Sequence, residues 1–344
     1  MKKIETGILF LGLILSLIIT SSATFGQSAT GLSSVQPRMR VIIDNDFSGD
    51  PDGLFQLAHH LMSPSVEIQA IIGSHLSVKD GFDGSTTQAD NAVKKAREVL
   101  QVMNITKNIP VLAGSNIAMP NDSTPVRSEA VNFIIQEALR TDTKLPLYVV
   151  CGAGLTEIAS AVLTNPAIAN KLTLIWIGGP EYTDLSPPPP NYTEVEYNLN
   201  IDRAAARVIF NKSTVPLWQV PRNMYRQCLL TYAQLLTKVK PHGKIGAHLT
   251  GTLETLMARI QRFINIGETY IVGDSPLVLL TALQSSFEAD PSSSDYVIRQ
   301  APLINQNATY AYNHKGRPIR VYTRLDTSLM MADFFAKLEL MDGH

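Results

Sequence analysis

Residues 40–53 read RVIIDNDFSGDPDG, a short β-branched run that breaks off into carboxylates and Gly49. Such a run, bounded by turn residues, predicts a buried strand that leads directly into a loop. Apolar residues at helical spacing follow over residues 54–62, and Ser63-Pro64 ends that pattern. A second apolar run, residues 66–72, ends at Gly73. The order strand, loop, helix, strand is a βαβ unit, which predicts a parallel sheet with helices on its faces.

The alternation of strand and helix patterns continues along the chain. We expect further strands over residues 109–112, 147–150, 172–177 and 215–220, and short ones, as a candidate hairpin, at 296–299 and 319–322. We expect further helices over residues 89–102, 128–139, 155–163, 202–210, 253–264 and 276–283. The proline run at 187–190 is interpreted as a stiff surface loop, because the alternation resumes directly after it. The predicted fold is α/β, with a single doubly wound, mostly parallel sheet flanked by helices.

The first 26 residues have the order of a secretory signal peptide. Lys2 and Lys3 precede an apolar run over residues 8–19, and a small, polar stretch follows up to Gln27. The apolar run is shorter than the roughly 20 residues that a membrane span needs, although an uncleaved anchor stays an alternative. We therefore expect a signal peptide over 1–26 and one mature domain over 27–344. The mature chain would be exported, periplasmic or secreted, with no stable membrane span after cleavage.

Composition limits the class of ligand. The formal net charge is −1 and the charged residues are interspersed, so nothing indicates nucleic-acid binding. This balance favours a small neutral or weakly charged ligand. The two cysteines, Cys151 and Cys228, are too few for a disulfide framework, and the sequence leaves open whether they pair.

The first strand is followed by four carboxylates within nine positions, Asp44, Asp46, Asp50 and Asp52. Carboxylates this dense repel one another, and burial raises that cost. A bound divalent cation would resolve the conflict, and all-oxygen ligands favour Ca²⁺ or Mg²⁺. The alternative is a solvated turn whose aspartates cap the following helix.

Other polar segments lie where they could join this loop. Asp274 precedes an apolar helix, and by itself it reads as a helix cap. Residues 196–202 alternate acids and amides, which in an extended segment would face the same way and suit hydrogen bonds to a polyol. Ligands of open parallel sheets bind beyond the carboxyl ends of the strands. The acidic loop, Gly152, the glycines at 178–179 and the segment after Val220 can therefore meet in one pocket.

Five segments in this order resemble the inosine-uridine-preferring nucleoside hydrolase family. The family signature, D-x-D-P-G-x-D-D, ends the first strand, and the later blocks are T-G-P-L-T-N, M-G-G, E-F-N with a following Asp, and H-D-P-L. Besides the acidic loop, the counterparts here are residues 152–159, 177–179, 196–198 with Asp202, and 273–277. The resemblance implies a nucleoside hydrolase-like, Rossmann-like sheet.

The resemblance also implies an enzyme that uses Ca²⁺ to cleave the N-glycosidic bond of ribonucleosides or similar N-ribosides, giving ribose and a free base. Asp46 matches the metal ligand that is the proposed general base for the attacking water. Asp274 matches the late ligand that also touches the ribose diol, and the carbonyl ligand would be Gly152, or Cys151 if the loop is shifted. The remaining matches are the ribose-hydroxyl binders Glu196 and Asn198, more loosely Asn191, and Asp44 as a supporting residue. Because family members form dimers and tetramers, the chain could be a homo-oligomer.

Two departures from the family signature bear on the metal. The paired acids are not present as a pair, because Asp52 takes the place of the first and Gly53 that of the second. The loop is also two residues longer, and we expect Asp50 to supply the missing carboxylate. The predicted metal ligands are Asp46, Asp50, Asp52, Gly152 and Asp274, with Asp52 also a sugar contact. Which of Asp50 and Asp52 touches the ion stays open.

A third departure bears on the leaving base. Gly273 stands where the family has a histidine that is a candidate acid for this group. Candidates near strand ends are His75, Arg222 and Tyr225, whereas the mid-helix His59 and His60 are interpreted as packed or solvated. The change is also compatible with a leaving group that needs little protonation, with hydrolysis of another sugar derivative, or with a catalytically inactive sugar- or nucleoside-binding protein.

Overall fold

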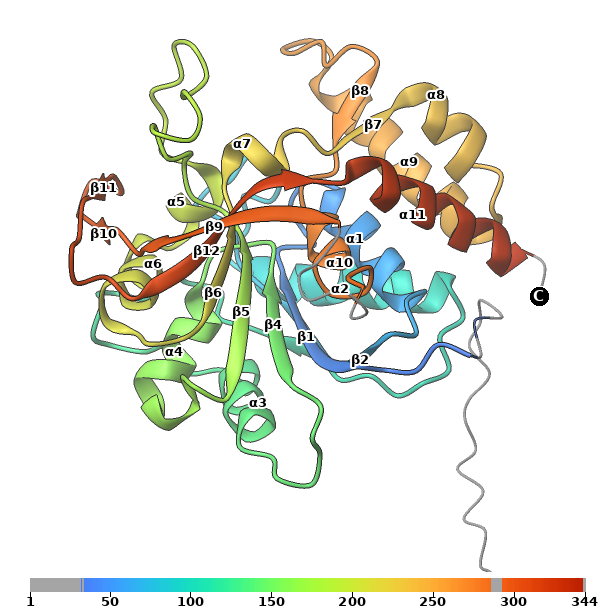
Figure 1. Cartoon of the computed structure of the whole chain (residues 1–344). Helices are drawn as coiled ribbons and strands as arrows, with labels where there is room; N and C mark the ends of the chain where they lie inside the picture. Colours follow the sequence, from blue (N-terminus) through green and yellow to red (C-terminus); the bar gives the residue numbers. More distant parts are fainter. Residues whose placement is uncertain (1–31, 33, 286–292, 343–344) are drawn as a thin grey trace, which may run out of the picture.

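A computed structural model describes residues 32, 34–285 and 293–342 of the chain (Figure 1). Its centre is an eight-stranded sheet in the order β3-β2-β1-β4-β5-β6-β12-β9. Neighbouring strands pair in parallel except at the edge, where β9 runs antiparallel to β12. The predicted doubly wound, mostly parallel sheet is therefore confirmed. The predicted signal peptide lies outside the described residues.

The main strands are β1 (Met39–Asn45), β2 (Val66–Gly73), β3 (Val111–Ala113), β4 (Leu147–Cys151), β5 (Leu172–Ile177), β6 (Leu217–Val220), β9 (Ser294–Gln300) and β12 (Pro318–Leu325). Two small ribbons pair β7 (Leu229–Thr231) with β8 (Thr269–Ile271) and β10 (Leu303–Ile304) with β11 (Tyr310–Ala311). The helices are α1 (Asp52–Leu61), α2 (Gln88–Val102), α3 (Glu129–Ala138), α4 (Thr156–Thr164), α5 (Tyr197–Ile201), α6 (Arg203–Arg207), α7 (Arg222–Tyr225), α8 (Tyr232–Gln234), α9 (Gly243–Ile260), α10 (Pro276–Leu279) and α11 (Thr327–Asp342).

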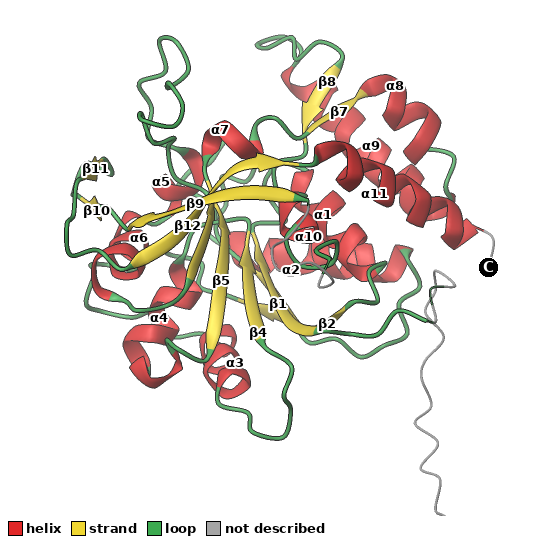
Figure 2. Ribbon diagram, in the orientation of Figure 1, coloured by secondary structure: helices red, strands yellow, loops and turns green. Residues whose placement is uncertain are grey.

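Helices cover both faces of the sheet, with α1, α2, α9 and α11 on one side and α3, α4 and α6 on the other (Figure 2). Strand β1 shows why, because all seven of its residues are buried and its side chains alternate between the two faces. Val41 and Ile43 pack with the first group of helices, whereas Ile42 packs with the second. A strand buried on both faces reads as a continuous apolar run, which is the pattern that the sequence shows.

Several element predictions need correction. The helix expected at 253–264 begins ten residues earlier, at Gly243, and ends at Ile260. The strands expected as a hairpin do pair antiparallel, but the β10–β11 ribbon lies between them in the sequence. The helix expected over 202–210 is α6 followed by a π-helical turn, Val208–Lys212. Helix α11 was not predicted. Cys151 and Cys228 are both buried free thiols, so they do not pair.

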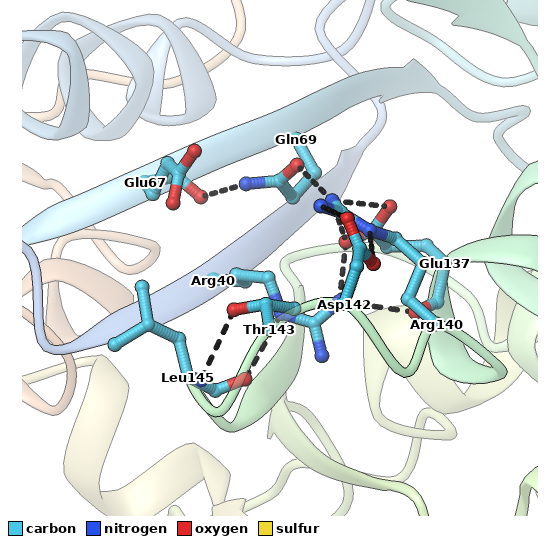
Figure 3. Close-up of polar contacts among 8 residues, drawn as sticks. All are labelled: Arg40, Glu67, Gln69, Glu137, Arg140, Asp142, Thr143 and Leu145. Carbon is cyan, nitrogen blue, oxygen red and sulfur yellow. Dashed lines mark hydrogen bonds and ion pairs between the residues drawn. The ribbon is translucent and has the colours of Figure 1, made fainter. Parts of the chain in front are cut away.

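The amino end of β1 carries a buried ion pair (Figure 3). The Arg40 guanidinium pairs with the Glu137 carboxylate of α3, and both side chains are about 6% exposed. Arg40 also donates to the carbonyl oxygens of Glu137, at 3.0 Å, and Leu145, at 2.9 Å. These contacts tie α3 and the loop before β4 to the end of β1 that is opposite the acidic loop.

We expect Glu137→Gln to lower the free energy of unfolding by about 3 kcal/mol, because it leaves a buried guanidinium without its counter-charge. Denaturant unfolding at neutral pH measures the change. Asp142→Asn is the matched control, because Asp142 pairs with Arg140 in the same cluster but its side chain is 69% exposed. An unfolding midpoint for Glu137→Gln equal to that of the control would contradict the assigned role of the pair.

Candidate functional site

A cavity of about 200 Å³ lies beyond the carboxyl ends of β1, β4 and β5. In Figure 1, α5 and α7 stand at this upper end of the central strands. The cavity is lined by carboxylates, small residues and aromatic rings: Asp46, Asp50, Asp52, Phe82, Gly152, Ile177, Tyr197, Asn198, Tyr225, Ile271, Gly273 and Asp274. Segments far apart in the sequence meet here because parallel strands place their carboxyl ends at one edge of the sheet.

The register of the sheet places the acidic loop beside Gly152. Asp44 of β1 lies opposite Cys151 of β4, and the Gly152 amide donates to the Asp44 carbonyl oxygen at 3.0 Å. The next residues of both strands therefore enter the cavity together. Asp274 arrives from the loop before α10, and a side chain on Gly152 would place its Cβ 2.7 Å from the Asp274 Cγ atom. Glycine at 152 is what allows the carboxylate to approach.

The carboxyl groups in the cavity oppose one another's ionisation. Burial raises the pKa of Asp46 well above its usual value, and the charges of Asp274 and Asp50 raise it further. Burial likewise raises the pKa of Asp274 to about 7, and it raises that of Asp52 well above the usual range. Such crowding of acids in a desolvated cavity is the electrostatic setting that a bound cation relieves.

Asp50 and Asp52 both line this cavity. The Tyr270 hydroxyl of β8 donates to Asp50 Oδ2 at 2.7 Å, which orients the Asp50 carboxylate. The Asp52 carboxyl group shares hydrogen bonds with those of Asp50 and Asp274. Both side chains therefore face the carboxylates of Asp46 and Asp274. Tyr270 carried no sequence signal, because it lies in a three-residue strand 220 positions away.

The acid and amide of the segment at 196–198 lie at a helix start and not in the extended segment that we expected. Glu196 caps α5 by accepting the Leu199 amide at 2.9 Å, and it also accepts the Gly179 amide at 2.7 Å. Asn198 lines the cavity and donates to the carbonyl oxygens of Gly152, at 3.1 Å, and Ile177, at 2.8 Å. Glu196 is a helix cap and Asn198 lies in the first turn of α5. Their spacing of two residues resembles the alternation of a strand, which is why the sequence predicted an extended segment.

The three candidates for the leaving-group acid are placed differently. Tyr225 lines the cavity, and its hydroxyl donates to Glu196 Oε1 at 2.8 Å. Arg222 pairs with Glu181 and, with Glu196, lines a neighbouring cavity of about 550 Å³. His75 is buried outside the cavity lining, with Nε2 2.9 Å from the Thr156 hydroxyl. Asn191, the looser ribose match, lies in an exposed loop away from this lining.

Asp44 lies buried behind the cavity. The Ser74 hydroxyl donates to its Oδ1, and the buried Glu157 is close enough for the two charges to interact. Burial raises the pKa of Asp44 to about 7 and that of Glu157 to about 8. The sequence analysis missed Glu157, whose Oε1 accepts the Ser115 amide at 2.7 Å, and Phe82 and Tyr197 of the lining.

The donor chemistry of the cavity fits a hard cation. Within residues 32, 34–285 and 293–342, no three His, Cys, Asp or Glu side chains are grouped as they are around a bound ion. Four carboxyl groups nevertheless line one small cavity beside the Gly152 backbone. Burial first, and then the neighbouring negative charges, raise the pKa values of Asp46, Asp52 and Asp274. All of these donors are oxygens, which suits Ca²⁺ or Mg²⁺ better than zinc.

Comparison with known protein families finds a match to the sequence of this chain. The sequence pattern of the inosine-uridine preferring nucleoside hydrolase family matches residues 41–331. No protein with a curated functional description matches the chain.

Three similar solved structures are hydrolases by name. A plant nucleoside hydrolase is 18% identical, with 88% of this chain and 99% of that one covered and a TM-score of 0.64. A purine-preferring ribonucleoside hydrolase from Gardnerella vaginalis is also 18% identical, with coverage of 89% and 100% and a TM-score of 0.65. An inosine-uridine preferring nucleoside hydrolase from Bacillus anthracis is 16% identical, with coverage of 87% and 99% and a TM-score of 0.63. At these identities, the likeness concerns the fold.

Proposed function

The chain belongs to the inosine-uridine preferring nucleoside hydrolase family, and on that premise we propose that it hydrolyses the N-glycosidic bond of ribonucleosides, or similar N-ribosides, with the help of Ca²⁺. The products are ribose and a free base. The observation that carries the proposal is the gathering of Asp46, Asp50, Asp52 and Asp274 around one cavity at the carboxyl end of the sheet.

The residues that would hold Ca²⁺ are the four carboxylates and the Gly152 carbonyl oxygen. When bound, the ion lowers the pKa of a water molecule and orients the vicinal hydroxyls of the sugar. Asp46 accepts the proton of the attacking water, which requires its carboxylate form and a short contact. Asp274 and Asp52 face the sugar, and Asn198 lines the same wall. The anionic wall stabilises the positive charge that develops on the sugar as the bond to the base breaks.

The leaving base is protonated by a weak acid of the protein, or it departs without protonation by the protein. Gly273 offers no side chain, and of the three candidate acids Tyr225 alone lines the cavity. Burial, and then the Glu196 charge, raise the pKa of Tyr225 well above its usual value. The single hydroxyl proton of Tyr225 is donated to Glu196 Oε1, at 2.8 Å, so Tyr225 is ill suited to protonate the base. We infer a preference for substrates whose base leaves with little protonation.

Two alternatives to nucleoside hydrolysis are motivated by Gly53 and Gly273, which stand where the family has an acid and a histidine. The chain could hydrolyse another sugar derivative on the same fold, or it could bind a sugar or nucleoside without turnover. A panel of purine and pyrimidine nucleosides distinguishes them when free base and reducing sugar are measured with Ca²⁺ and with a chelator. We expect Ca²⁺-dependent release from at least one nucleoside. Binding by calorimetry without release from any substrate would establish the inactive alternative.

We further propose that residues 1–26 are a cleaved signal peptide, that residues 27–344 form one domain, and that the mature protein is periplasmic or secreted. The n-, h- and c-region order of the first 26 residues supports this. In the part of the chain that the structure describes, no helix is long and apolar enough to cross a membrane. Amino-terminal sequencing of the mature protein from its native host tests the cleavage, and light scattering tests whether the chain forms a dimer or tetramer.

A further inference from the structure

A line of buried polar side chains runs from the cavity wall through α1 to the residues that follow α10. Its members are Asn45, Gln56, His60 and Thr281, and none is more than 1% exposed. Buried amides and imidazoles keep a fixed arrangement when every donor meets an acceptor. The direction of every hydrogen bond along this line is therefore fixed by the backbone groups at its two ends, the Asp46 amide and the Leu277 carbonyl oxygen.

The first end lies at the acidic loop. Asn45 Oδ1 accepts the Asp46 backbone amide at 2.9 Å, so the Asn45 NH₂ group points the other way. It donates to Asp274 Oδ2 at 2.9 Å and to Gln56 Oε1 at 3.2 Å. Turning the Asn45 amide over would bring two donors face to face at the Asp46 amide, so this orientation is fixed.

The other members follow in the same direction. Because Gln56 Oε1 is an acceptor, Gln56 Nε2 donates to His60 Nδ1. His60 Nε2 lies 3.0 Å from the Thr281 hydroxyl, which itself donates to the Leu277 carbonyl oxygen at 2.6 Å. Burial, the neighbouring His59 and Lys337 hold the pKa of His60 well below its usual value, so the ring is neutral. Its single proton must then lie on Nε2.

Two glycines give Asn45 its place. A Cβ on Gly53 would lie 2.9 Å from Asn45 Nδ2, and a Cβ on Gly152 would lie 2.6 Å from it. Contacts below 3.0 Å require a shift. The amide therefore fills space that a side chain at position 53 would need, and position 53 is where the family signature has its second paired acid. A neutral donor stands beside Asp274 in place of a carboxylate.

We propose that Asn45 is a positioning residue that holds Asp274 by a direct hydrogen bond. A one-way hydrogen-bond relay, Asn45–Gln56–His60–Thr281, keeps the Asn45 amide in the orientation that this bond needs. Because Asn45 places an amide donor where the family has an acid, it also lowers the affinity of the cavity for Ca²⁺. This rests on the proposed function, because Asp274 is taken as a ligand of the ion. Because the relay links the two side chains, the ring nitrogen of His60 that carries the proton reveals which way the Asn45 amide is oriented.

The tautomer of His60 tests the relay without any activity measurement. In the ¹⁵N spectrum of the full chain we expect the His60 proton on Nε2. In Asn45→Asp, measured with Ca²⁺ bound so that the new carboxyl group is ionised, position 45 can only accept from Gln56. Gln56 therefore turns over, and the His60 proton moves to Nδ1. The same variant should bind Ca²⁺ about tenfold more tightly by calorimetry, because it adds a carboxylate at the site.

Asn132→Asp is the matched control, since it adds the same charge on an exposed position of α3. It should change neither the His60 tautomer nor the Ca²⁺ affinity. A wild-type His60 protonated on Nδ1 would overturn the relay even if Asn45→Asp failed to fold. An Asn45→Asp protein that binds Ca²⁺ no more tightly than the wild type would overturn the role assigned to Asn45. Failure to cleave any nucleoside would refute the proposed function but leave both readouts intact.

Discussion

Asp46→Asn is expected to lower kcat by about 10²- to 10⁴-fold, the range that a general base contributes. Asparagine keeps the size and the hydrogen-bonding capacity of the side chain but cannot take a proton from water. Folding should survive, because the replacement removes a buried acid whose ionisation Asp274 and Asp50 oppose. The measurement is the rate of base release at saturating nucleoside and Ca²⁺, with circular dichroism to check the fold.

The matched control is Asp80→Asn. Asp80 accepts the Tyr197 hydroxyl at 2.8 Å, and its charge acts on Asp46, but it is not among the residues that line the cavity. Removing that charge should change kcat far less than Asp46→Asn does. Undiminished turnover by Asp46→Asn would rule out Asp46 as the base, whatever the control shows.

Gly152→Ala is expected to lower kcat/KM by about 100-fold, because a displacement of about 1 Å at a reacting group has costs of that order. The new Cβ would lie 2.6 Å from Asn45 Nδ2 and 2.7 Å from Asp274 Cγ, so both side chains must move. The Gly152 backbone also shifts, and its carbonyl oxygen accepts the Asn198 amide that shapes the same wall. Kinetics on the best nucleoside of the panel, together with Ca²⁺ affinity by calorimetry, measure the effect.

Gly251→Ala, in α9, is the matched glycine control. A Cβ at that position has nothing within 4 Å, and alanine is the better helix residue. We expect unchanged kinetics and an unfolding temperature that is equal or slightly higher. If Gly152→Ala behaved like Gly251→Ala, the close approach of Asp274 to this strand end would have no role in catalysis.

The sheet could be predicted because its strands are buried on both faces. The apolar runs of β1 and β2 flank a helix with clear periodicity, and this local pattern alone indicates a βαβ unit. The position of Asp46 and Gly152 in one cavity followed from a general property of parallel sheets, namely that the carboxyl ends of the strands meet. Asp274 precedes α10 and follows no strand of this sheet, so only the family resemblance indicated its place.

The remaining parts of the site depend on contacts that no local pattern encodes. Tyr270 reaches Asp50 across 220 positions of sequence, and the Glu196 acid is held by the distant Gly179 and Tyr225. Asn45 was passed over because a single amide between two aspartates resembles a turn residue. Its importance is visible only when Gly53, Gly152 and Asp274 are placed around it.

The fate of water oxygen tests the central claim most directly. The full chain is incubated with the nucleoside panel, Ca²⁺ and no phosphate in ¹⁸O-labelled water, and the sugar product is analysed by mass spectrometry. We predict free base together with ribose that carries one ¹⁸O atom from the attacking water, and loss of both products when a chelator is added. Absence of free base from every nucleoside, or release of base without labelled ribose, would contradict N-glycosidic hydrolysis by this protein.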